Sequence, residues 1–421
     1  MTKKKIKEKI IFTPEMVTFK DSKKTPFQSW FPYLEGYSPN FVNIIIKKFM
    51  PKSNTILDPF AGTLTTGFAA SELGINSLFC EINPVLQFIG NTKIEVRTLN
   101  FDLRKILAKT IEDISINLKD NLRKYGKDQH LEKTYYKIFN HDSNKPFIKK
   151  NLQEILISKS YIEDLKSKSF LISKLVTVAS LISLVPSSLL KRAGDLRYKT
   201  PKELKKGIPS FADLVQNNLN VIKNDLLSFY PSLKNPPFLI CENAFNLRKL
   251  PFLNIDGVIT SPPYVNGTNY FRNTKLELWY LRFFRNPADL SNIRKNAVTA
   301  GINSVIGGKK ESNNKKVQNI VEKLSQSPYD NRIPKMISNY FADIHDIFLS
   351  IKTHLNDGAM LAIDIGDSQF GGVYVPTDEL LKSVMEDIGY NFIEDHYLRP
   401  RYSKNGKRLK QILLLFTVDK T

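Results

Sequence analysis

The sequence contains few of the residues that build covalent or metal-bound sites. Its 421 residues include two cysteines and five histidines, and the histidines are scattered without the spacing of zinc ligands. We therefore predict that the protein holds no metal. Cys80 and Cys241 both lie among apolar residues at predicted strand ends. This pattern is typical of reduced thiols in the core of a cytoplasmic protein.

Long apolar runs are also missing. The most apolar run, Phe170 to Val185, is interrupted by Lys174 and is too short to cross a bilayer. The first residues are charged, and no apolar segment of a signal peptide follows them. We expect a cytoplasmic protein with no membrane partner.

Two phosphate-binding signatures do not occur either. The chain has no G-x-G-x-x-G run of a dinucleotide site, and it has no Gly-Lys-Ser/Thr of a P-loop. A cradle for a pyrophosphate is therefore disfavoured.

Positive charge, in contrast, is abundant. The chain has 62 Lys and Arg against 41 Asp and Glu, a net charge of +21, while its 42% hydrophobic content is that of a globular protein. Such an excess favours a polyanionic partner, nucleic acid before an anionic membrane. A solvated, lysine-rich surface is the alternative interpretation.

A strand, a tight turn, a helix and a second strand are predicted between residues 54 and 81. The first strand ends at Asp58, Gly74 closes the helix, and the second strand (residues 76–80) ends on Glu81. Glu81 lies 23 residues after Asp58. This layout favours a nucleotide-type site at the carboxyl ends of parallel strands, where the acid binds ribose hydroxyls. A helix-capping role for Asp58 and a solvated strand end at Glu81 are the alternatives.

The stretch Ser-Pro-Pro-Tyr at residues 261–264 follows a short buried strand at residues 256–259. Two prolines end the strand, because neither has an N–H to donate and both fix φ. The resulting stiff loop presents a hydroxyl, carbonyl oxygens and the ring of Tyr264 at the mouth of the sheet. Such a loop suits a planar group that carries an amine, since the oxygens accept its hydrogens and the ring stacks on it. A proline-rich turn with a core tyrosine is the alternative.

Residues 96–235 differ from their surroundings, because they are helical in pattern and show no convincing strand. The predicted helices in this insertion are Phe101 to Tyr125, Asn151 to Lys168, Phe170 to Val185 and Phe211 to Tyr230. A basic stretch, Lys191 to Lys206, is either a phosphate-contacting segment or a solvated linker.

The second half of the chain completes a sheet. Its predicted elements are a strand from Pro237, an amphipathic helix from Lys275 to Phe284, a flexible basic loop at 296–317, a helix from Ile333 to Leu355, a strand from Gly358 to Gly366 and a helix from Thr377 to Ile388. Residues 390–398 and 411–418 are predicted to pair as strands around the turn Asn405-Gly406, within a basic ribbon.

Four motifs follow one another in a fixed order: Asp58 to Gly62 with Thr65 and Thr66, Glu81 to Pro84, Glu242 to Leu247, and Thr260 to Tyr264. Together they resemble the amino-group DNA methyltransferases that use S-adenosylmethionine. The resemblance covers about residues 25–95 and 236–420. The Ser-Pro-Pro-Tyr loop is most similar to the cytosine-N4 branch, since adenine-N6 enzymes more often carry Asp or Asn before the prolines.

The resemblance implies an α/β fold, a doubly wound, mostly parallel, seven-stranded Rossmann-like methyltransferase sheet with a C-terminal antiparallel hairpin and a helical insertion. We divide the chain into a basic arm (1–24), a first methyltransferase part (25–95), the insertion with a candidate DNA-recognition role (96–235) and a second methyltransferase part (236–421). A helix beginning at Ser38 and Pro39 precedes the first strand.

The resemblance also implies roles for individual residues. Around S-adenosylmethionine, Glu81 would hold the ribose hydroxyls and Asn243 would lie at the adenine edge. Ser261 and the carbonyl of Pro262 would accept hydrogen bonds from the target amine, and Tyr264 would stack on the extruded base. The implied cofactor-binding residues are Ser38, Pro39, Asp58, Pro59, Phe60, Ala61, Gly62, Thr65, Glu81, Asn243 and Ala244, and the implied catalytic residues are Ser261, Pro262, Pro263 and Tyr264.

Two departures from the family pattern concern the cofactor turn and the motif order. Leu64 stands where the family's turn usually has a second glycine, so a side chain there is expected to crowd the cofactor. The catalytic loop follows the cofactor motif, whereas many cytosine-N4 enzymes have the reverse order.

We therefore predict a site-specific DNA methyltransferase that modifies an exocyclic amine, cytosine N4 before adenine N6. Its expected partners are double-stranded DNA and, in a restriction–modification or defence setting, a cognate restriction endonuclease. An RNA amino-methyltransferase and a catalytically dead nucleic-acid-binding homologue are the alternatives.

Overall fold

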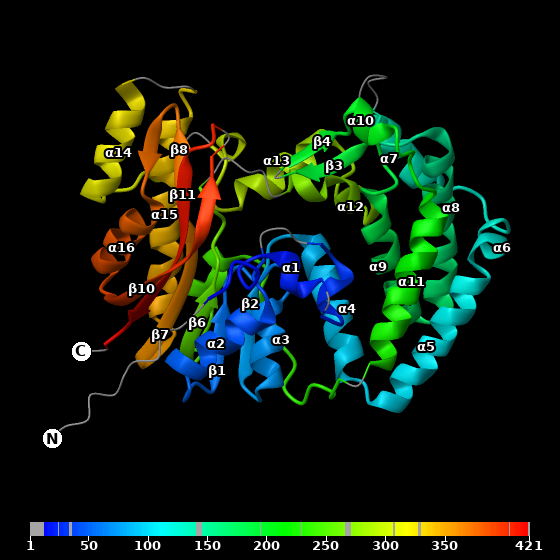
Figure 1. Cartoon of the computed structure of the whole chain (residues 1–421), viewed down its shortest axis with the longest axis horizontal. Coiled ribbons are helices and arrows are strands. Elements are labelled where there is room, and N and C mark those ends of the chain that lie inside the picture. Colours follow the sequence, from blue (N-terminus) through cyan, green and yellow to red (C-terminus); the bar gives the residue numbers. More distant parts are fainter. Residues whose placement is uncertain are drawn as a thin grey trace.

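The computed structural model describes residues 12–23, 25–32, 36–139, 145–193, 195–228, 230–265, 271–305, 308–326, 330–403 and 405–419. Its centre is a sheet of seven strands: β1 (Thr55–Asp58), β2 (Asn76–Cys80), β5 (Phe238–Cys241), β6 (Ile255–Thr260), β7 (Leu355–Gly366), β10 (Asn391–Tyr402) and β11 (Arg408–Thr417). Their order across the sheet is β10-β11-β7-β6-β1-β2-β5 (Figure 1).

The sheet is mostly parallel. Neighbouring strands among β5, β2, β1, β6 and β7 pair in parallel, whereas β11 pairs antiparallel with both β7 and β10. The predicted α/β fold, with a doubly wound parallel sheet and a C-terminal antiparallel hairpin, is therefore confirmed. The chain moves from β1 outward to β2 and β5, then returns to β6 on the other side of β1, so the strand order reverses between β1 and β6.

Helices cover both faces of this sheet, because successive side chains of a strand point to opposite faces. Ile56 of β1 packs in one core cluster, while its neighbour Leu57 packs in another. The helices that cover the first face are α2 (Pro39–Phe49) and α3 (Thr65–Glu72), and those that cover the second are α14 (Lys315–Gln326), α15 (Ile333–Lys352) and α16 (Thr377–Ile388).

The helical region lies beyond α4 (Pro84–Thr98), as Figure 1 shows, and shares one core cluster with it. Its helices are α5 (Phe101–Ile116), α6 (Leu118–Leu122), α7 (Gln129–Ile138), α8 (Lys149–Lys168), α9 (Phe170–Leu184) and α11 (Phe211–Leu227). Trp30 and Trp279, from outside this region, are buried in the same core. None of the described helices is long and apolar enough to cross a membrane.

The prediction that this region has no strands is wrong. The antiparallel strands β3 (Leu190–Ala193) and β4 (Asp195–Tyr198) pair there and precede the short helix α10 (Pro201–Leu204). Strands of four residues are too short to show an alternating pattern. Leu190 and Leu196 are buried, and the exposed Lys191 and Arg197 side chains form ion pairs with Glu203.

The helix predicted from Lys275 to Phe284 is shorter than expected. Helix α12 (Lys275–Tyr280) ends early because the backbone turns at Arg282, whose φ is 67°. Five of its six residues are buried, so it is a core helix and not an amphipathic one. Further elements that the pattern did not predict are the helices α1 (Phe19–Ser22), α7, α13 (Pro287–Lys295) and α14, the strands β8 (Ser368–Phe370) and β9 (Val373–Val375), and the 3-10 turns Gln28–Trp30, Ala244–Lys249, Arg272–Thr274 and Ile302–Ser304.

The loop predicted to be flexible and basic at 296–317 packs against α15 along much of its course. Lys309 pairs with Asp343, and Lys310 pairs with Asp346, so two of its cations are neutralised within the fold. Residues 306 and 307 lie outside the described residues.

The segment predicted as a basic arm is packed on the fold where the structure describes it. The Phe12 and Phe41 ring centroids lie 5.2 Å apart, and the Ser38 amide donates to the Met16 carbonyl at 2.7 Å. Residues 1–11 of the predicted arm lie outside the described residues.

The turn between β1 and α3 uses two residues with positive φ. Gly62 has a φ of 53°, and Leu64 has a φ of 69° in the left-handed region that glycine adopts most readily. The Leu64 side chain turns into a small core cluster with Phe68, and it is accommodated because residue 90 of α4 is glycine. A Cβ atom at Gly90 would lie 2.6 Å from Leu64 Cδ1.

We predict that Gly90→Ala lowers the free energy of unfolding by about 1–3 kcal/mol, because the added methyl group overpacks the Leu64 side chain. In a Leu64→Gly background, Gly90→Ala should instead raise the free energy of unfolding, because alanine has up to about 1 kcal/mol more helix propensity than glycine. Urea unfolding of the four proteins in this double-mutant cycle measures the coupling. Additive effects of the two substitutions would contradict the proposed contact.

Candidate active site

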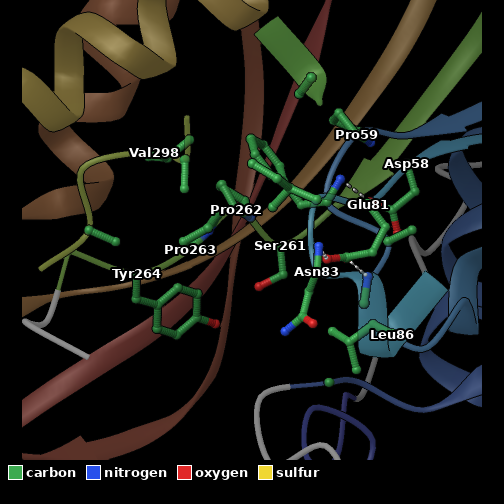
Figure 2. Close-up of a pocket in the computed structure, with 18 of the residues that line it drawn as sticks. Asp58, Pro59, Glu81, Asn83, Leu86, Ser261, Pro262, Pro263, Tyr264 and Val298 are labelled. Carbon is green, nitrogen blue, oxygen red and sulfur yellow. Dashed lines mark hydrogen bonds between the residues drawn. The ribbon is translucent and has the colours of Figure 1, made fainter. Parts of the chain in front are cut away.

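A cavity opens at the carboxyl ends of the parallel strands, between β1 and β6, where the strand order reverses. In an open α/β sheet this reversal leaves a crevice in which ligands bind. Segments from both halves of the chain line the cavity (Figure 2): Gly36, Tyr37, Asp58 to Thr63, Thr65, Glu81 to Asn83, Leu86, Asn243, Ala244, Ser261 to Tyr264, Phe271, Ala297, Val298, Ala300, Gly301, Ser304 and Ile347.

The structure brings thirteen of the fifteen sequence-predicted site residues to this cavity, all except Ser38 and Pro39. Ser38 is fully buried, and its side chain accepts from the Phe41 amide to cap α2. The preceding residues, Gly36 and Tyr37, line the cavity instead. Ser38 and Pro39 therefore begin α2, and the cavity wall is formed by the two residues that precede them.

Asp58, at the end of β1, is held by three hydrogen bonds. Its Oδ1 accepts from Thr260 Oγ1 at 2.7 Å and from the Phe60 amide at 3.1 Å, and its Oδ2 accepts from the Tyr37 hydroxyl at 3.3 Å. Burial raises the pKa of this carboxyl above its usual range, and the hydrogen bonds oppose the increase. The Thr260 contact joins the first residue of the cofactor motif to the strand that leads into the Ser-Pro-Pro-Tyr loop.

Glu81, at the end of β2, reaches across to the β1–α3 turn. Its Oε2 accepts from the Gly62 amide and its Oε1 from the Asn83 amide, each at 2.7 Å, as the dashed lines in Figure 2 show. Burial raises the pKa of this carboxyl to about 7, against the lowering effect of the two amides. A buried carboxylate at this place is an acceptor for a ligand's hydroxyl groups.

Leu64 does not line the cavity, although the sequence led us to expect that its side chain would crowd a ligand. Its side chain points into the cluster with Phe68, where Gly90 leaves room for it. The second half of the turn is also held by Lys93, whose Nζ donates to the Thr63 carbonyl at 3.1 Å. Burial lowers the pKa of this lysine to about 7.

The Ser-Pro-Pro-Tyr loop leaves the end of β6 and faces Glu81 and Asp58 across the cavity. In Figure 2, Ser261 lies between Tyr264 on one side and Asn83 and Glu81 on the other. The loop thus has the arrangement that its prolines predict, with its polar atoms at the mouth of the sheet.

Tyr264 is fixed by residues of the strands behind it. Its hydroxyl donates to Asp364 Oδ2 at 3.1 Å, and Asp364 also accepts from Gln411 Nε2 at 2.8 Å. Burial raises the pKa of Asp364 to about 6. The Arg401 guanidinium lies over the Tyr264 ring, 4.8 Å from its centroid, and Arg401 is not among the residues that line the cavity.

Asn243 and Ala244 follow β5 and close the far end of the cavity. Asn243 Nδ2 donates to the Asn296 carbonyl at 2.8 Å, and its Oδ1 accepts from the Phe245 amide at 3.1 Å. The two cysteines face each other at the same end of the sheet, with Cys80 Sγ 3.0 Å from Cys241 Sγ. Within the described parts of the chain, no three His, Cys, Asp or Glu side chains are grouped as metal ligands would be.

Sequence reasoning missed several residues of the site. The loop residues Val298, Ala300 and Gly301 line the cavity because long-range packing against α15 brings them there, and their sequence carries no signal of this. Asp364 did offer a signal, since it is a carboxylate inside the apolar strand that ends at Gly366.

The cavity therefore has two chemically different sides. One side presents the buried Glu81 carboxylate and the β1–α3 turn, which suit a nucleoside. The other presents hydroxyl and carbonyl oxygens beside an aromatic ring, which suit a planar amine.

Comparisons with known proteins find sequence similarity to DNA methyltransferases. Residues 8–90 match the family model for N6/N4-type DNA methylases. The chain is 26% identical to the type II methyltransferase M.BsoBI of Geobacillus stearothermophilus over 96% of this chain and 86% of that protein. It is also 26% identical to the type II methyltransferase M.AvaI of a Nostoc species, over 90% of this chain and 82% of that protein.

Shorter and weaker similarities also occur. The type II methyltransferase M.MjaII of Methanocaldococcus jannaschii is 30% identical over 31% of this chain and 25% of that protein. The rRNA methyltransferase aviRa of Streptomyces viridochromogenes, a solved structure, superposes with a TM-score of 0.32 and 8% identity over 95% of this chain and 92% of that one. A structural similarity at that level carries no weight here. The family model, the two long matches and the motifs around the cavity confirm the predicted resemblance of this chain to the amino-group DNA methyltransferases.

Proposed function

We propose that this protein transfers a methyl group from S-adenosylmethionine to the exocyclic N4 amine of a cytosine in double-stranded DNA. The observation that carries the proposal is the shared cavity, in which Glu81 and the Ser-Pro-Pro-Tyr loop face each other. The proposal places the protein in the cytoplasm with its DNA substrate.

The residues of the cavity fit the proposed cofactor. Glu81 is a buried carboxylate whose oxygens can accept from ribose hydroxyls, and Asn243, which lines the same cavity, would lie at the adenine edge. The turn from Asp58 to Gly62 would line the methionine side, and the Leu64 side chain does not occupy that space. When bound, S-adenosylmethionine supplies an electrophilic methyl group on its sulfonium.

The chain's own residues would prepare the amine for attack. An exocyclic amine is a poor nucleophile, because its lone pair is delocalised into the ring. The Ser261 hydroxyl and the Pro262 carbonyl would accept the amine's two hydrogens, which favours a tetrahedral nitrogen with a directed lone pair. Positioning of this kind can lower the activation free energy by roughly 7–11 kcal/mol.

The base must leave the duplex to reach this loop, because its amine is buried in base pairing. Tyr264 would stack on the extruded ring. Its orientation is fixed by Asp364 at the hydroxyl and by Arg401 over the ring, so the stacking platform is held in place before the base arrives.

The choice of cytosine N4 follows the Ser-Pro-Pro-Tyr form of the loop, and adenine N6 is the alternative amine. The relatives are type II methyltransferases, and a restriction–modification setting with a cognate endonuclease is the biological context that we propose for this chain.

Methyl transfer from labelled S-adenosylmethionine to unmethylated DNA and to RNA, followed by nucleoside analysis, tests the proposal. We expect N4-methylcytosine in DNA. N6-methyladenine in DNA would show that the protein methylates an exocyclic amine but that its target base is adenine. Label in RNA alone, or no transfer to either, would contradict the proposal.

We predict that Ser261→Ala and Tyr264→Ala each lower kcat by about 100-fold, because a misplaced amine loses the alignment that the loop provides. The Kd for S-adenosylmethionine, measured by calorimetry, should stay close to the wild-type value. Tyr264→Phe is the matched control, since it keeps the stacking ring and removes only the hydroxyl, which is hydrogen-bonded to Asp364 and Ser261. Parallel losses of cofactor affinity and turnover would refute these roles.

Cofactor affinity should rise with pH through the range around 7. The pKa of Glu81 is raised to about 7, so the carboxylate that accepts from ribose hydroxyls is only partly present at pH 6. If only the ionised form binds, affinity increases by about tenfold between pH 6 and pH 8. Calorimetry over this range measures it. Glu81→Gln, which cannot ionise, should bind weakly with a flat profile, and a flat profile in the wild type would contradict the role of Glu81.

A further inference from the structure

The end of the C-terminal hairpin carries a concentration of positive charge. We call residues 399–410 the basic ribbon. It contains no Asp or Glu and six cations: Arg399, Arg401, Lys404, Lys407, Arg408 and Lys410. Lys404 lies outside the described residues.

The basic ribbon extends beyond the carboxyl edge of the sheet, on the side where the cavity opens. Gln411 of β11 pairs with Gly366, the last residue of β7, so the strand residues from Arg408 to Lys410 continue past the end of β7. They stay paired with β10, where Tyr402 is opposite Arg408. In Figure 1, β10 and β11 form one edge of the sheet, coloured red.

The base of the basic ribbon touches the wall of the cavity. Arg401 lies over the ring of Tyr264, which lines the cavity and which we propose stacks on the target base. A polymer that delivers a base to Tyr264 therefore has to pass close to the basic ribbon.

Lys407 and Arg408 of the basic ribbon form no ion pair in the part of the chain that the structure describes, whereas Arg399 and Arg401 lie near enough to the buried Asp364 to lower its pKa. Lys410 pairs with Asp378 at 2.7 Å, which is the only ion pair of the ribbon residues that the structure describes. Arg399 Nε donates to Gln411 Oε1 at 2.7 Å, and Arg408 donates to the Tyr397 hydroxyl at 3.4 Å. Both of those partners are uncharged acceptors.

The other two basic segments have a larger share of their described cations in ion pairs, although Lys205 and Lys206 of the insertion are exposed. In the insertion, Lys191 and Arg197 pair with Glu203, and Arg192 pairs with the fully buried Glu277. In the 296–317 loop, Lys309 and Lys310 pair with the α15 carboxylates described above. Internal ion pairs reduce the charge that these segments can offer to a partner.

Exposed aromatic rings accompany the charges of the basic ribbon. Tyr402 is 68% exposed, and Tyr397, five residues earlier on β10, is 52% exposed. Hydroxyl groups of this kind donate to phosphate oxygens, alongside the guanidinium and ammonium groups that provide most such contacts.

We propose that the basic ribbon binds the sugar–phosphate backbone of double-stranded DNA beside the extruded base. This inference rests on the proposed function and goes beyond it, because it assigns the surface that holds the duplex in register over Tyr264. A two-stranded ribbon is narrow enough to lie along a groove of the duplex. Phosphate contacts fix position and do not read sequence.

The test compares two double variants that remove the same charge. K407A/R408A neutralises two exposed cations of the basic ribbon, and K205A/K206A neutralises two exposed lysines of the insertion as the matched control. Binding to unmethylated 30-base-pair duplexes of mixed sequence is followed by fluorescence anisotropy as a function of salt. Calorimetry with S-adenosylhomocysteine verifies that both variants keep the cofactor site.

We expect the slope of log K against log salt to fall by about 0.9 for each phosphate contact that the ribbon variant loses. The control variant should keep the wild-type slope. A wild-type slope in the ribbon variant, or an equal or larger loss in the control, would overturn the assignment of this surface and leave the proposed function intact. A wild-type protein without salt-dependent duplex binding would instead overturn the proposed function.

Discussion

The buried hydrogen bond between Thr260 and Asp58 ties together the two strands on which the whole site depends. These residues are 202 positions apart in the chain, yet they end neighbouring strands, β6 and β1, at the point where the strand order reverses. One strand leads into the Ser-Pro-Pro-Tyr loop and the other into the cofactor turn. A site for two ligands arises because the sheet places these two strand ends next to each other. No described residue of the helical insertion lines the cavity between them.

Buried carboxylates recur at this edge of the sheet, in a protein whose net charge is +21. Asp58, Glu81 and Asp364 end or nearly end three strands, and burial raises the pKa of each one. Their hydrogen-bond partners are amides and hydroxyls, and a bound cation is not needed to satisfy them. Positive charge lies on the outer hairpin, where Arg399 and Arg401 lower the pKa of Asp364. The interior is thereby suited to a neutral base and hydroxyl-bearing nucleoside, while the exterior suits phosphates.

Local chemistry decided how much of this could be predicted from the sequence. Helix α16 begins and ends at the predicted residues, and the strand, turn and helix after residue 54 were also predicted. Both predictions succeeded because helix caps and glycines such as Gly74 act over only a few residues. From the sequence we expected the Leu64 side chain to crowd the cofactor. The space that accommodates it is left by Gly90, which lies on another helix, further along the chain. The wall contributed by residues 297–304 and the hydrogen bond that Tyr264 donates to Asp364 were not predictable, because both depend on tertiary packing.

A crystal structure with S-adenosylhomocysteine bound is the measurement that tests the central claim most directly. The account predicts the ribose on Glu81, the adenine beside Asn243, and the sulfur directed toward Ser261 and Tyr264. The two segments would then act as one site. Ligand bound elsewhere, or bound with its sulfur directed away from the Ser-Pro-Pro-Tyr loop, would contradict the assignment of this cavity as the place of methyl transfer.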